Sequence, residues 1–312
     1  MSEHILSVRD LTKRVSKNKA IVDGVSFDMR KGEILGLLGP NGAGKTTTIR
    51  MIVGLIKKSG GSVTINGKDI DKEAQATRAD IGAIVENPAF YEYMSGYKNL
   101  KLSARMAKAS EARIDEVIKL VQLEKAIKDK VSKYSLGMKQ RLGVAQAMLH
   151  KPALLILDEP TNGLDPKGIR ELRDYLRELA NEGISTLVSS HLLSEMQLMC
   201  DRVVIMEKGK VIDISELATL NAYKEEGNEI VSLLVKKGQG QLAKDLLEEV
   251  EDVRLVSQEK EHELIFEMPR RLIPMVNKQL VGAEVDVFGI ESKRTSLEEK
   301  FLALTAEQKG EV

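Results

Sequence analysis

Short apolar runs alternate with longer segments of helical spacing along the first two thirds of the chain. Five short runs predict strands, four of them buried, at residues 33–38, 62–67, 81–85, 154–157 and 184–188. Apolar residues at helical spacing predict helices from about residue 45 to 56 and over 97–130, 167–181 and 192–200. Strands that alternate with helices favour an α/β fold with a mainly parallel sheet covered on both faces.

The pattern changes near residue 220. After a polar segment at 221–228, strands are predicted at 230–235, 253–256, 263–266 and 285–290, and helices at 241–250 and 270–280. This β-α-β-β-α-β order is typical of a small ferredoxin-like α+β module. We therefore expect two domains, residues 1–220 and 221–312.

Charge is the first property that composition adds. The chain has 47 Lys+Arg and 47 Asp+Glu, which argues against a general nucleic-acid binder. Residues 221–312, however, hold 13 basic and 19 acidic residues, so a balance of +6 in the first 220 residues is hidden by −6 in the rest. The split weakens the argument from composition, and a basic first domain suits polyphosphate or an anionic membrane surface, although solvated charge explains it as well.

Other features of composition bear on location. Cys200 is the single cysteine, so no intramolecular disulfide can form, and its place on an apolar helical face predicts a buried packing residue. The N-terminus lacks the layout of a secretion signal, and no apolar run reaches the about 20 residues that span a bilayer. We expect a cytoplasmic protein whose membrane role comes through a partner.

A glycine-rich run between the first buried strand and its helix predicts a nucleotide site. Residues 39–46 read Gly-Pro-Asn-Gly-Ala-Gly-Lys-Thr, a full match to the phosphate-loop pattern. The glycines let successive N–H groups point inward, and the helix N-terminus adds its dipole. Lys45 can reach the terminal phosphates, and the Thr46 hydroxyl suits Mg²⁺. The predicted nucleotide-binding residues here are Gly39, Asn41, Gly42, Gly44, Lys45, Thr46 and Thr47.

Two adjacent carboxylates end the apolar strand 154–157. Ligands of open α/β sheets bind at this edge, and neighbouring carboxylates can divide the work of hydrolysis. We assign Asp158 to Mg²⁺ and Glu159 to the attacking water. A solvated acidic turn would explain this pair alone, but not together with a phosphate loop upstream.

Three later motifs complete a resemblance to the ATP-binding cassette (ABC) subunits of transporters. Residues 134–141, Tyr-Ser-Leu-Gly-Met-Lys-Gln-Arg, resemble the family signature and place Ser135 23 residues before Asp158. Residues 162–165, Asn-Gly-Leu-Asp, resemble the D-loop, and residues 189–191, Ser-Ser-His, resemble the switch histidine. The resemblance covers about residues 4–215. It implies a P-loop ATPase fold with an antiparallel N-terminal subdomain and a helical subdomain at about 90–140.

By this resemblance two ATP-binding domains pair head to tail, as a homodimer or as a heterodimer with a paralogue. Each ATP would lie between the phosphate loop of one copy and Ser135 and Gly137 of the other, with Asp165 nearby and His191 on the γ-phosphate. Simpler explanations remain for Ser135 and His191 as helix caps and for Gly137 as a packing glycine.

The chain departs from the family pattern at two positions. Glu86 stands where most members have Gln, and it could still reach Mg²⁺ or water. This Glu, with the Leu136 and Met138 form of the signature, resembles the bacitracin-export and lantibiotic-immunity subfamily. Val15 stands where an aromatic residue usually stacks on adenine, so we expect weak discrimination between bases.

The aromatic residues after Glu86 suggest a partner. In the family, the neighbourhood of Phe90, Tyr91 and Tyr93 receives the membrane subunit, although a local hydrophobic plug would also explain these side chains. The resemblance implies an ATPase at the inner face of the membrane that drives export of an amphiphilic compound, such as a peptide antibiotic, through a separate permease. The alternatives are a non-transport ABC ATPase acting on ribosomes or DNA and a ligand-sensing regulator.

Overall fold

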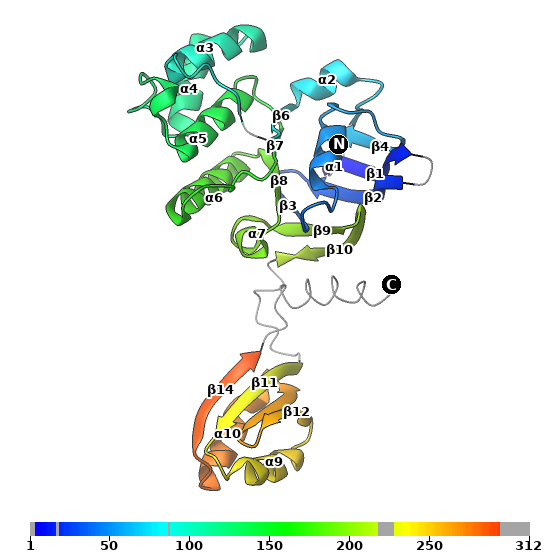
Figure 1. Cartoon of the computed structure of the whole chain (residues 1–312), viewed down its shortest axis with the longest axis vertical. Helices are drawn as coiled ribbons and strands as arrows, with labels where there is room; N and C mark the ends of the chain where they lie inside the picture. The colour runs from blue at the N-terminus through cyan, green and yellow to red at the C-terminus, as the bar shows by residue number, and fades with distance from the viewer. Residues whose placement is uncertain (1–3, 17–18, 87, 218–227, 294–312) are drawn as a thin grey trace. The chain divides into compact units, whose positions relative to one another are not determined.

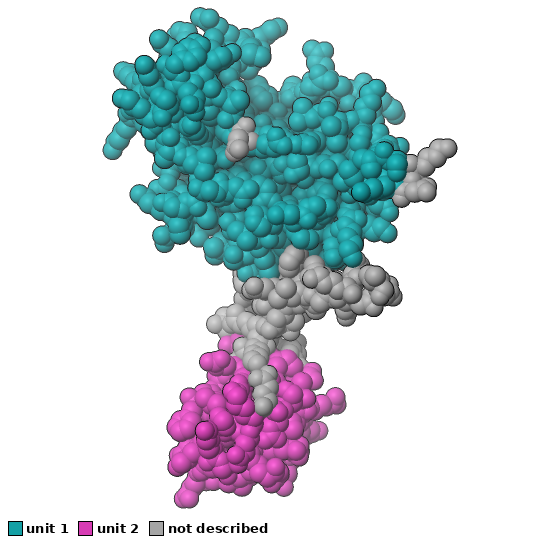
Figure 2. All heavy atoms as spheres, viewed as in Figure 1, with its two compact units in different colours: residues 1–218 teal, residues 219–312 magenta. Residues whose placement is uncertain are grey.

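The computed structural model describes residues 4–16, 19–86, 88–217 and 228–293, and the chain divides into two units, residues 1–218 and 219–312 (Figure 2). Each unit has its own cluster of buried apolar side chains. The predicted linker at 221–228 falls almost entirely on residues outside the described ranges.

A six-stranded sheet of order β10-β9-β3-β8-β7-β6 forms the centre of the first unit. Its strands are β3 (Ile34–Leu38), β6 (Ile81–Ile84), β7 (Leu154–Leu157), β8 (Ser185–Ser190), β9 (Arg202–Glu207) and β10 (Lys210–Glu216). Strands β3, β7 and β8 are buried at every position, as expected for central strands covered on both faces. All neighbouring strands are parallel except β10, which is antiparallel to β9.

A second, antiparallel sheet of order β2-β1-β4-β5 shares the core of this unit. Its strands are β1 (His4–Ser16), β2 (Lys19–Arg30), β4 (Gly60–Ile65) and β5 (Lys68–Asp69). Of these strands, only β4 is predicted from the sequence. Register shifts interrupt the alternation of β1, whereas residues 25–29 of β2 alternate between apolar and polar positions and do carry a strand signal.

Helices of the first unit cover the central sheet and form a group of their own. They are α1 (Lys45–Ile52), α2 (Ala74–Ala79), α3 (Gly96–Ala107), α4 (Glu111–Leu120), the 3-10 turn η1 (Val131–Lys133), α5 (Leu136–Ala147), α6 (Pro166–Asn181) and α7 (Leu193–Met199). Helices α3, α4 and α5 gather on one side of the unit (Figure 1). The helical prediction over 97–130 is wrong in two respects, because residues 121–130 are not helical and the remainder is divided. Lys108 takes a left-handed φ of 54° and Ser110 caps a new helix, so two short helices form there.

The second unit is an antiparallel sheet of order β12-β13-β11-β14 with two helices. Its elements are β11 (Asn228–Val235), α9 (Gly240–Glu248), β12 (Arg254–Lys260), β13 (Glu263–Pro269), the 3-10 turn η2 (Arg270–Leu272), α10 (Ile273–Gly282) and β14 (Val287–Lys293). The core takes Val231 and Leu233 of β11, Phe266 of β13 and Leu247 of α9. This strand order confirms the predicted ferredoxin-like α+β fold.

No helix in the described ranges combines the length and the apolar character that a bilayer crossing requires.

Candidate active site

Four adjacent strands bring the predicted site residues to one edge of the central sheet. In the order β3-β8-β7-β6, the strands end at the phosphate loop, the Ser-Ser-His motif, the Asp-Glu pair and Glu86. Because these strands are parallel, their carboxyl ends lie along the same edge. The sheet therefore assembles residues that are up to 152 positions apart in the sequence.

The phosphate loop has the backbone that an anion site needs. Gly42 and Gly44 have φ values of 84° and 99°, which glycine adopts without strain. A Cβ on Gly39 would lie 2.3 Å from the backbone oxygen of Met206, so no larger residue fits there without a backbone shift. Helix α1 begins directly after Gly44, and no side chain caps it. Its first N–H groups are thus left for a phosphate ligand.

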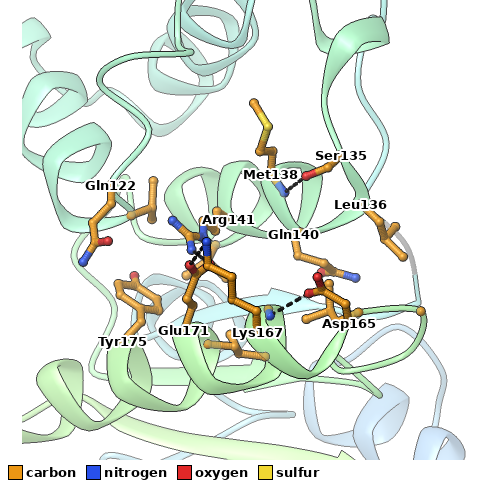
Figure 3. A pocket seen from close by; sticks show the side chains of 17 residues that line it. Gln122, Ser135, Leu136, Met138, Gln140, Arg141, Asp165, Lys167, Glu171 and Tyr175 are labelled. Carbon is orange, nitrogen blue, oxygen red and sulfur yellow. Dashed lines mark hydrogen bonds and ion pairs between the residues drawn. The ribbon is translucent and has the colours of Figure 1, made fainter.

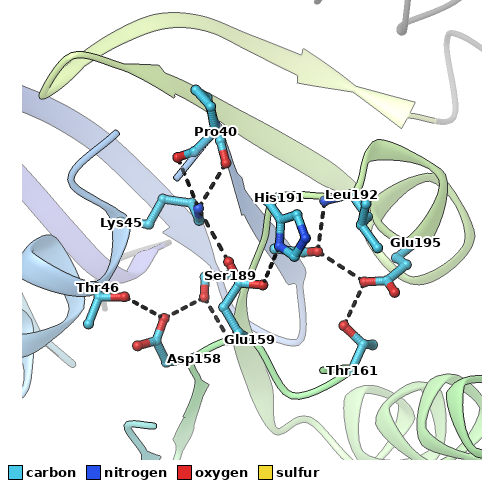
Figure 4. Close-up of polar contacts among 12 residues, drawn as sticks. Pro40, Lys45, Thr46, Asp158, Glu159, Thr161, Ser189, His191, Leu192 and Glu195 are labelled. Carbon is cyan, nitrogen blue, oxygen red and sulfur yellow. Dashed lines mark hydrogen bonds and ion pairs between the residues drawn. The ribbon is translucent and has the colours of Figure 1, made fainter. Parts of the chain in front are cut away.

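Lys45 is held at the mouth of this loop. Its side chain is only 5% exposed, and its Nζ donates hydrogen bonds to the backbone oxygens of Gly39 at 2.8 Å and Pro40 at 3.4 Å. The same Nζ lies 3.3 Å from Oε1 of Glu159 (Figure 4). A buried ammonium group with these partners supplies a fixed positive charge for terminal phosphates.

Asp158 lies within hydrogen-bond reach of Thr46, as the assignment of both to a metal requires. Its Oδ1 accepts hydrogen bonds from the Thr46 hydroxyl at 3.2 Å and from the Ser189 hydroxyl at 2.6 Å. Asp158 is 5% exposed. A carboxylate and a hydroxyl are hard oxygen donors that fit Mg²⁺, which usually binds through one or two protein oxygens together with substrate phosphates. In the described ranges, no group of three or more His, Cys, Asp or Glu side chains forms a full metal cage.

Glu159 and His191 contact each other directly. Oε2 of Glu159 lies 2.9 Å from Nδ1 of His191, and the Glu159 amide donates to the Ser189 hydroxyl at 2.9 Å. Glu159 has a φ of 50°, a conformation that is uncommon outside glycine and often found at functional turns. The carboxylate therefore sits between the Lys45 ammonium and the His191 ring (Figure 4).

A cavity of about 320 Å³ opens at these groups. Its lining combines the phosphate loop with the hydrolytic residues, and is formed by Ile21, Asn41, Gly42, Ala43, Gly44, Lys45, Thr46, Thr47, Glu159, Asn162 and His191. Ile21 and Asn162 were not predicted as site residues. Ile21 lies on β2, which is not among the strands predicted above, whereas Asn162 belongs to the recognised D-loop motif and could have been found there.

The signature and D-loop residues line a different cavity, of about 440 Å³, between α5 and α6 (Figure 3). Ser135 is the N-cap of α5 and accepts a hydrogen bond from the Met138 amide at 3.3 Å. Asp165 is the N-cap of α6 and accepts one from the Gly168 amide at 2.7 Å. Gly137 lies beside Ser135 in the first turn of α5. None of these three residues lines the phosphate-loop cavity of its own chain.

Glu86 and Val15 lie apart from the groups around Lys45. The Glu86 carboxylate forms an ion pair with Arg50 of α1, and Glu86 has a left-handed φ of 66°. Its role at Mg²⁺ stays a prediction. Val15 is exposed near the end of β1 and does not line the 320 Å³ cavity, so weak base discrimination also stays a prediction.

Two of the three aromatic residues after Glu86 form an exposed patch. Tyr91 is 55% and Tyr93 67% exposed, and their rings meet edge to face with centroids 6.0 Å apart. Phe90 is half-buried. Leu102 and Met106 of α3 add exposed apolar surface, and together with Tyr91 they line a hollow of about 420 Å³.

Cys200 is buried, as the sequence predicts. Its Sγ lies 3.6 Å from Sδ of Met196, and burial raises the pKa of the thiol far above its ordinary value. A packing role explains the residue.

Comparison with known proteins supports the reading of these motifs. The ABC transporter family model matches residues 22–162. The ABC transporter ATP-binding protein YhcH of Bacillus subtilis is 47% identical over 99% of this chain and 98% of its own length.

This chain belongs to the ABC transporter ATP-binding proteins.

Two further similarities concern the subfamily and the fold. The bacitracin transport ATP-binding protein BcrA of Bacillus licheniformis is 46% identical over 67% of this chain and 69% of its own length. The solved structure of CbiO1 from Clostridium perfringens, part of the ABC transporter complex CbiONQ, matches with a TM-score of 0.66 and 31% identity over 72% of this chain and 92% of that chain. The chain is thus an ATPase subunit of a transporter with the P-loop ABC fold, and the ribosome- or DNA-directed alternative is not favoured.

Proposed function

We propose that this ABC subunit lies at the inner face of the cell membrane and powers the export of an amphiphilic compound through a separate membrane subunit. The class of compound that we propose is a peptide antibiotic. Similarity to a bacitracin transport protein over two thirds of the chain supports this class of cargo. The carboxylate of Glu159, set between Lys45 Nζ at 3.3 Å and His191 Nδ1 at 2.9 Å, is the observation on which the hydrolytic part of the proposal rests.

In the proposed reaction, ATP lies with its β- and γ-phosphates on the loop N–H groups and Lys45. Glu159 accepts a proton from a water molecule whose oxygen bonds to the γ-phosphorus, and the bond to the β–γ bridging oxygen breaks to give ADP and phosphate. His191, which donates from Nδ1 to Glu159, would donate a second hydrogen bond from Nε2–H to the γ-phosphate, so both ring nitrogens carry a proton in this step. The fixed charges around the phosphates need no reorganisation as the reaction proceeds.

Thr46 and Asp158 are the residues that we expect to hold Mg²⁺, with Glu86 as a candidate third oxygen donor. When bound, the ion withdraws negative charge from the phosphate oxygens. Glu86 would have to leave Arg50 to contribute, and this exposed ion pair is of the kind that costs little to break.

We also propose the head-to-tail dimer. Because Ser135 and Gly137 lie outside the phosphate-loop cavity of their own chain, a second copy or a paralogue is the natural source of a signature for each ATP. The N-terminus of α5 would then offer its N–H groups to the γ-phosphate of the other copy. Asp165, as the N-cap of α6 beside this signature, would lie at the same interface.

The cargo proposal is tested on the full chain in its native membrane. We expect the chain to co-purify with a multi-span membrane protein, and ATP hydrolysis by the complex to rise when bacitracin is added. The complex that carries Glu159→Gln is the control. Because this variant lacks the proposed general base, bacitracin should not stimulate its ATP hydrolysis. Purification with ribosomes or DNA instead of a membrane protein would contradict transport, and a membrane complex whose turnover ignores bacitracin would contradict the peptide cargo.

Tyr91→Ala and Phe90→Ala are expected to uncouple the subunit from its permease. The Tyr91 ring is exposed beside the hollow lined by α3, so its loss should weaken docking and abolish cargo-stimulated turnover while basal hydrolysis persists. Leu198→Ala is the matched control, because Leu198 of α7 is an apolar residue of similar exposure. This variant should keep its cargo-stimulated ATP turnover. Loss of folding in the Phe90 and Tyr91 variants would instead support a structural plug.

A further inference from the structure

Glu195 of α7 is a buried carboxylate that the proposed reaction does not use. It is only 7% exposed, and within the described ranges no Lys, Arg or His forms an ion pair with it. Its Oε2 accepts hydrogen bonds from two hydroxyl groups, Thr161 at 2.6 Å and Ser190 at 2.9 Å (Figure 4). A buried carboxylate costs free energy unless it is hydrogen-bonded, and here both donors are hydroxyl groups within hydrogen-bond distance, with the bond from Thr161 the shorter.

The two hydroxyl groups lie close in sequence to the hydrolytic residues, one in the loop after β7 and one at the end of β8. Thr161 is two residues after Glu159, and Ser190 directly precedes His191. Ser190 also accepts a hydrogen bond from the Leu192 amide at 3.0 Å, so the residues on both sides of His191 are fixed to one oxygen. Glu195 therefore joins the loop after β7 to the last residue of β8, beside the contact between Glu159 and His191.

We propose that Glu195 is a positioning residue that keeps His191 in contact with Glu159. The inference rests on the roles proposed above for those two residues. A displacement of about 1 Å at a reacting group costs on the order of 100-fold in rate. The hydrogen bonds of Glu195 to Thr161 and Ser190 restrict the movement of Glu159 and His191 before ATP binds.

A simpler role for Glu195 would be to stabilise α7, because an acidic residue in the first turn interacts favourably with the helix dipole. The contacts argue against this as the main role. Both hydrogen bonds of Oε2 lead to residues outside α7, and no side chain caps that helix. The geometry is that of a bridge between the loop after β7 and the end of β8.

The test compares Glu195→Gln and Thr161→Val in the full chain. Each variant weakens or removes a bond to Oε2 with little change in volume, so we expect kcat for ATP to fall by about 10-fold or more while KM changes by less than about twofold. The decisive measurement is made in a His191→Ala background, where Glu195→Gln should lower kcat no further because the positioned group is gone.

Glu33→Gln is the matched control. Glu33 is another buried carboxylate, but it lies before β3 at the opposite edge of the sheet, where it accepts from the Arg30 amide and pairs with Arg202. The Glu33→Gln substitution should lower the melting temperature of the protein without lowering kcat. An unchanged kcat in Glu195→Gln and Thr161→Val, or a fall that adds in full to that of His191→Ala, would overturn the inference. Wild-type turnover in His191→Ala alone would instead overturn the proposed role of His191.

Discussion

Replacing Glu159 by Gln is expected to lower ATP turnover by about 100-fold or more, because the amide cannot accept the proton of the attacking water. The substitution keeps the size of the side chain and its place between Lys45 and His191. ATP binding should therefore survive, and it should even strengthen, since the amide removes a negative charge beside the γ-phosphate. We expect the ATP-bound variant to accumulate as a dimer.

Three measurements check this expectation: single-turnover hydrolysis, the equilibrium affinity for ATP, and the molecular mass in solution with and without ATP. Asp174→Asn is the control, because Asp174 is an exposed acidic residue of α6 that pairs only with its neighbour Arg173 among the described residues. That variant should match the wild type in all three. Retained wild-type turnover in Glu159→Gln would remove Glu159 from the role of general base.

The parts of the fold that could be predicted are those that sequence-local physics determines. Strands β3 and β7 are apolar at nearly every position because helices or sheets cover both of their faces, and this run is visible without any knowledge of tertiary contacts. Phosphate-loop residues could be predicted for the same reason. Gly42, Gly44 and Lys45 act within one turn of chain, so their spacing alone carries the geometry.

Elements and contacts that depend on distant partners were missed. Strand β1 pairs with several register shifts, and its own alternation is too irregular to mark it, whereas residues 25–29 of β2 alternate and carry a local strand signal. The link from Thr161 to Glu195 spans 34 positions and that from Ser189 to Asp158 spans 31. One signal was available for Glu195. A carboxylate directly before Met196 on a short apolar helix must either face solvent or find buried donors, and the structure shows the second outcome.

The ion pair between Glu86 and Arg50 shows a different limit. Sequence comparison within the motif suggests a metal ligand at position 86, because the family uses that position near the phosphates. Arg50 lies on α1, one turn beyond the phosphate loop, and a charge partner 36 positions away has no mark in the local pattern. The position of Glu86 in the folded chain and the bound nucleotide thus decide whether its carboxylate pairs with Arg50 or binds Mg²⁺. The spacing of motifs in the sequence does not decide this.

Lys45→Ala is expected to weaken ATP binding by about 10- to 100-fold, because a charge-assisted contact to phosphate is worth about 1.5–3 kcal/mol. The loss should be larger for ATP than for AMP, whose single phosphate lies farther from Nζ. Equilibrium binding of the two nucleotides measures the difference. Lys244→Ala, on α9 of the second unit, is the control and should bind both as the wild type does.

Lys45 and Glu159 together separate binding from chemistry. In the structure their side chains form one ion pair at 3.3 Å, so a purely structural role would make both substitutions destabilise the site in the same way. The proposed roles predict opposite results: Lys45→Ala loses affinity for ATP, whereas Glu159→Gln keeps or gains it and loses only turnover. Equal losses of affinity in both variants would contradict this division, because only an ion pair that shapes the cavity, without acting on phosphate or water, has that effect.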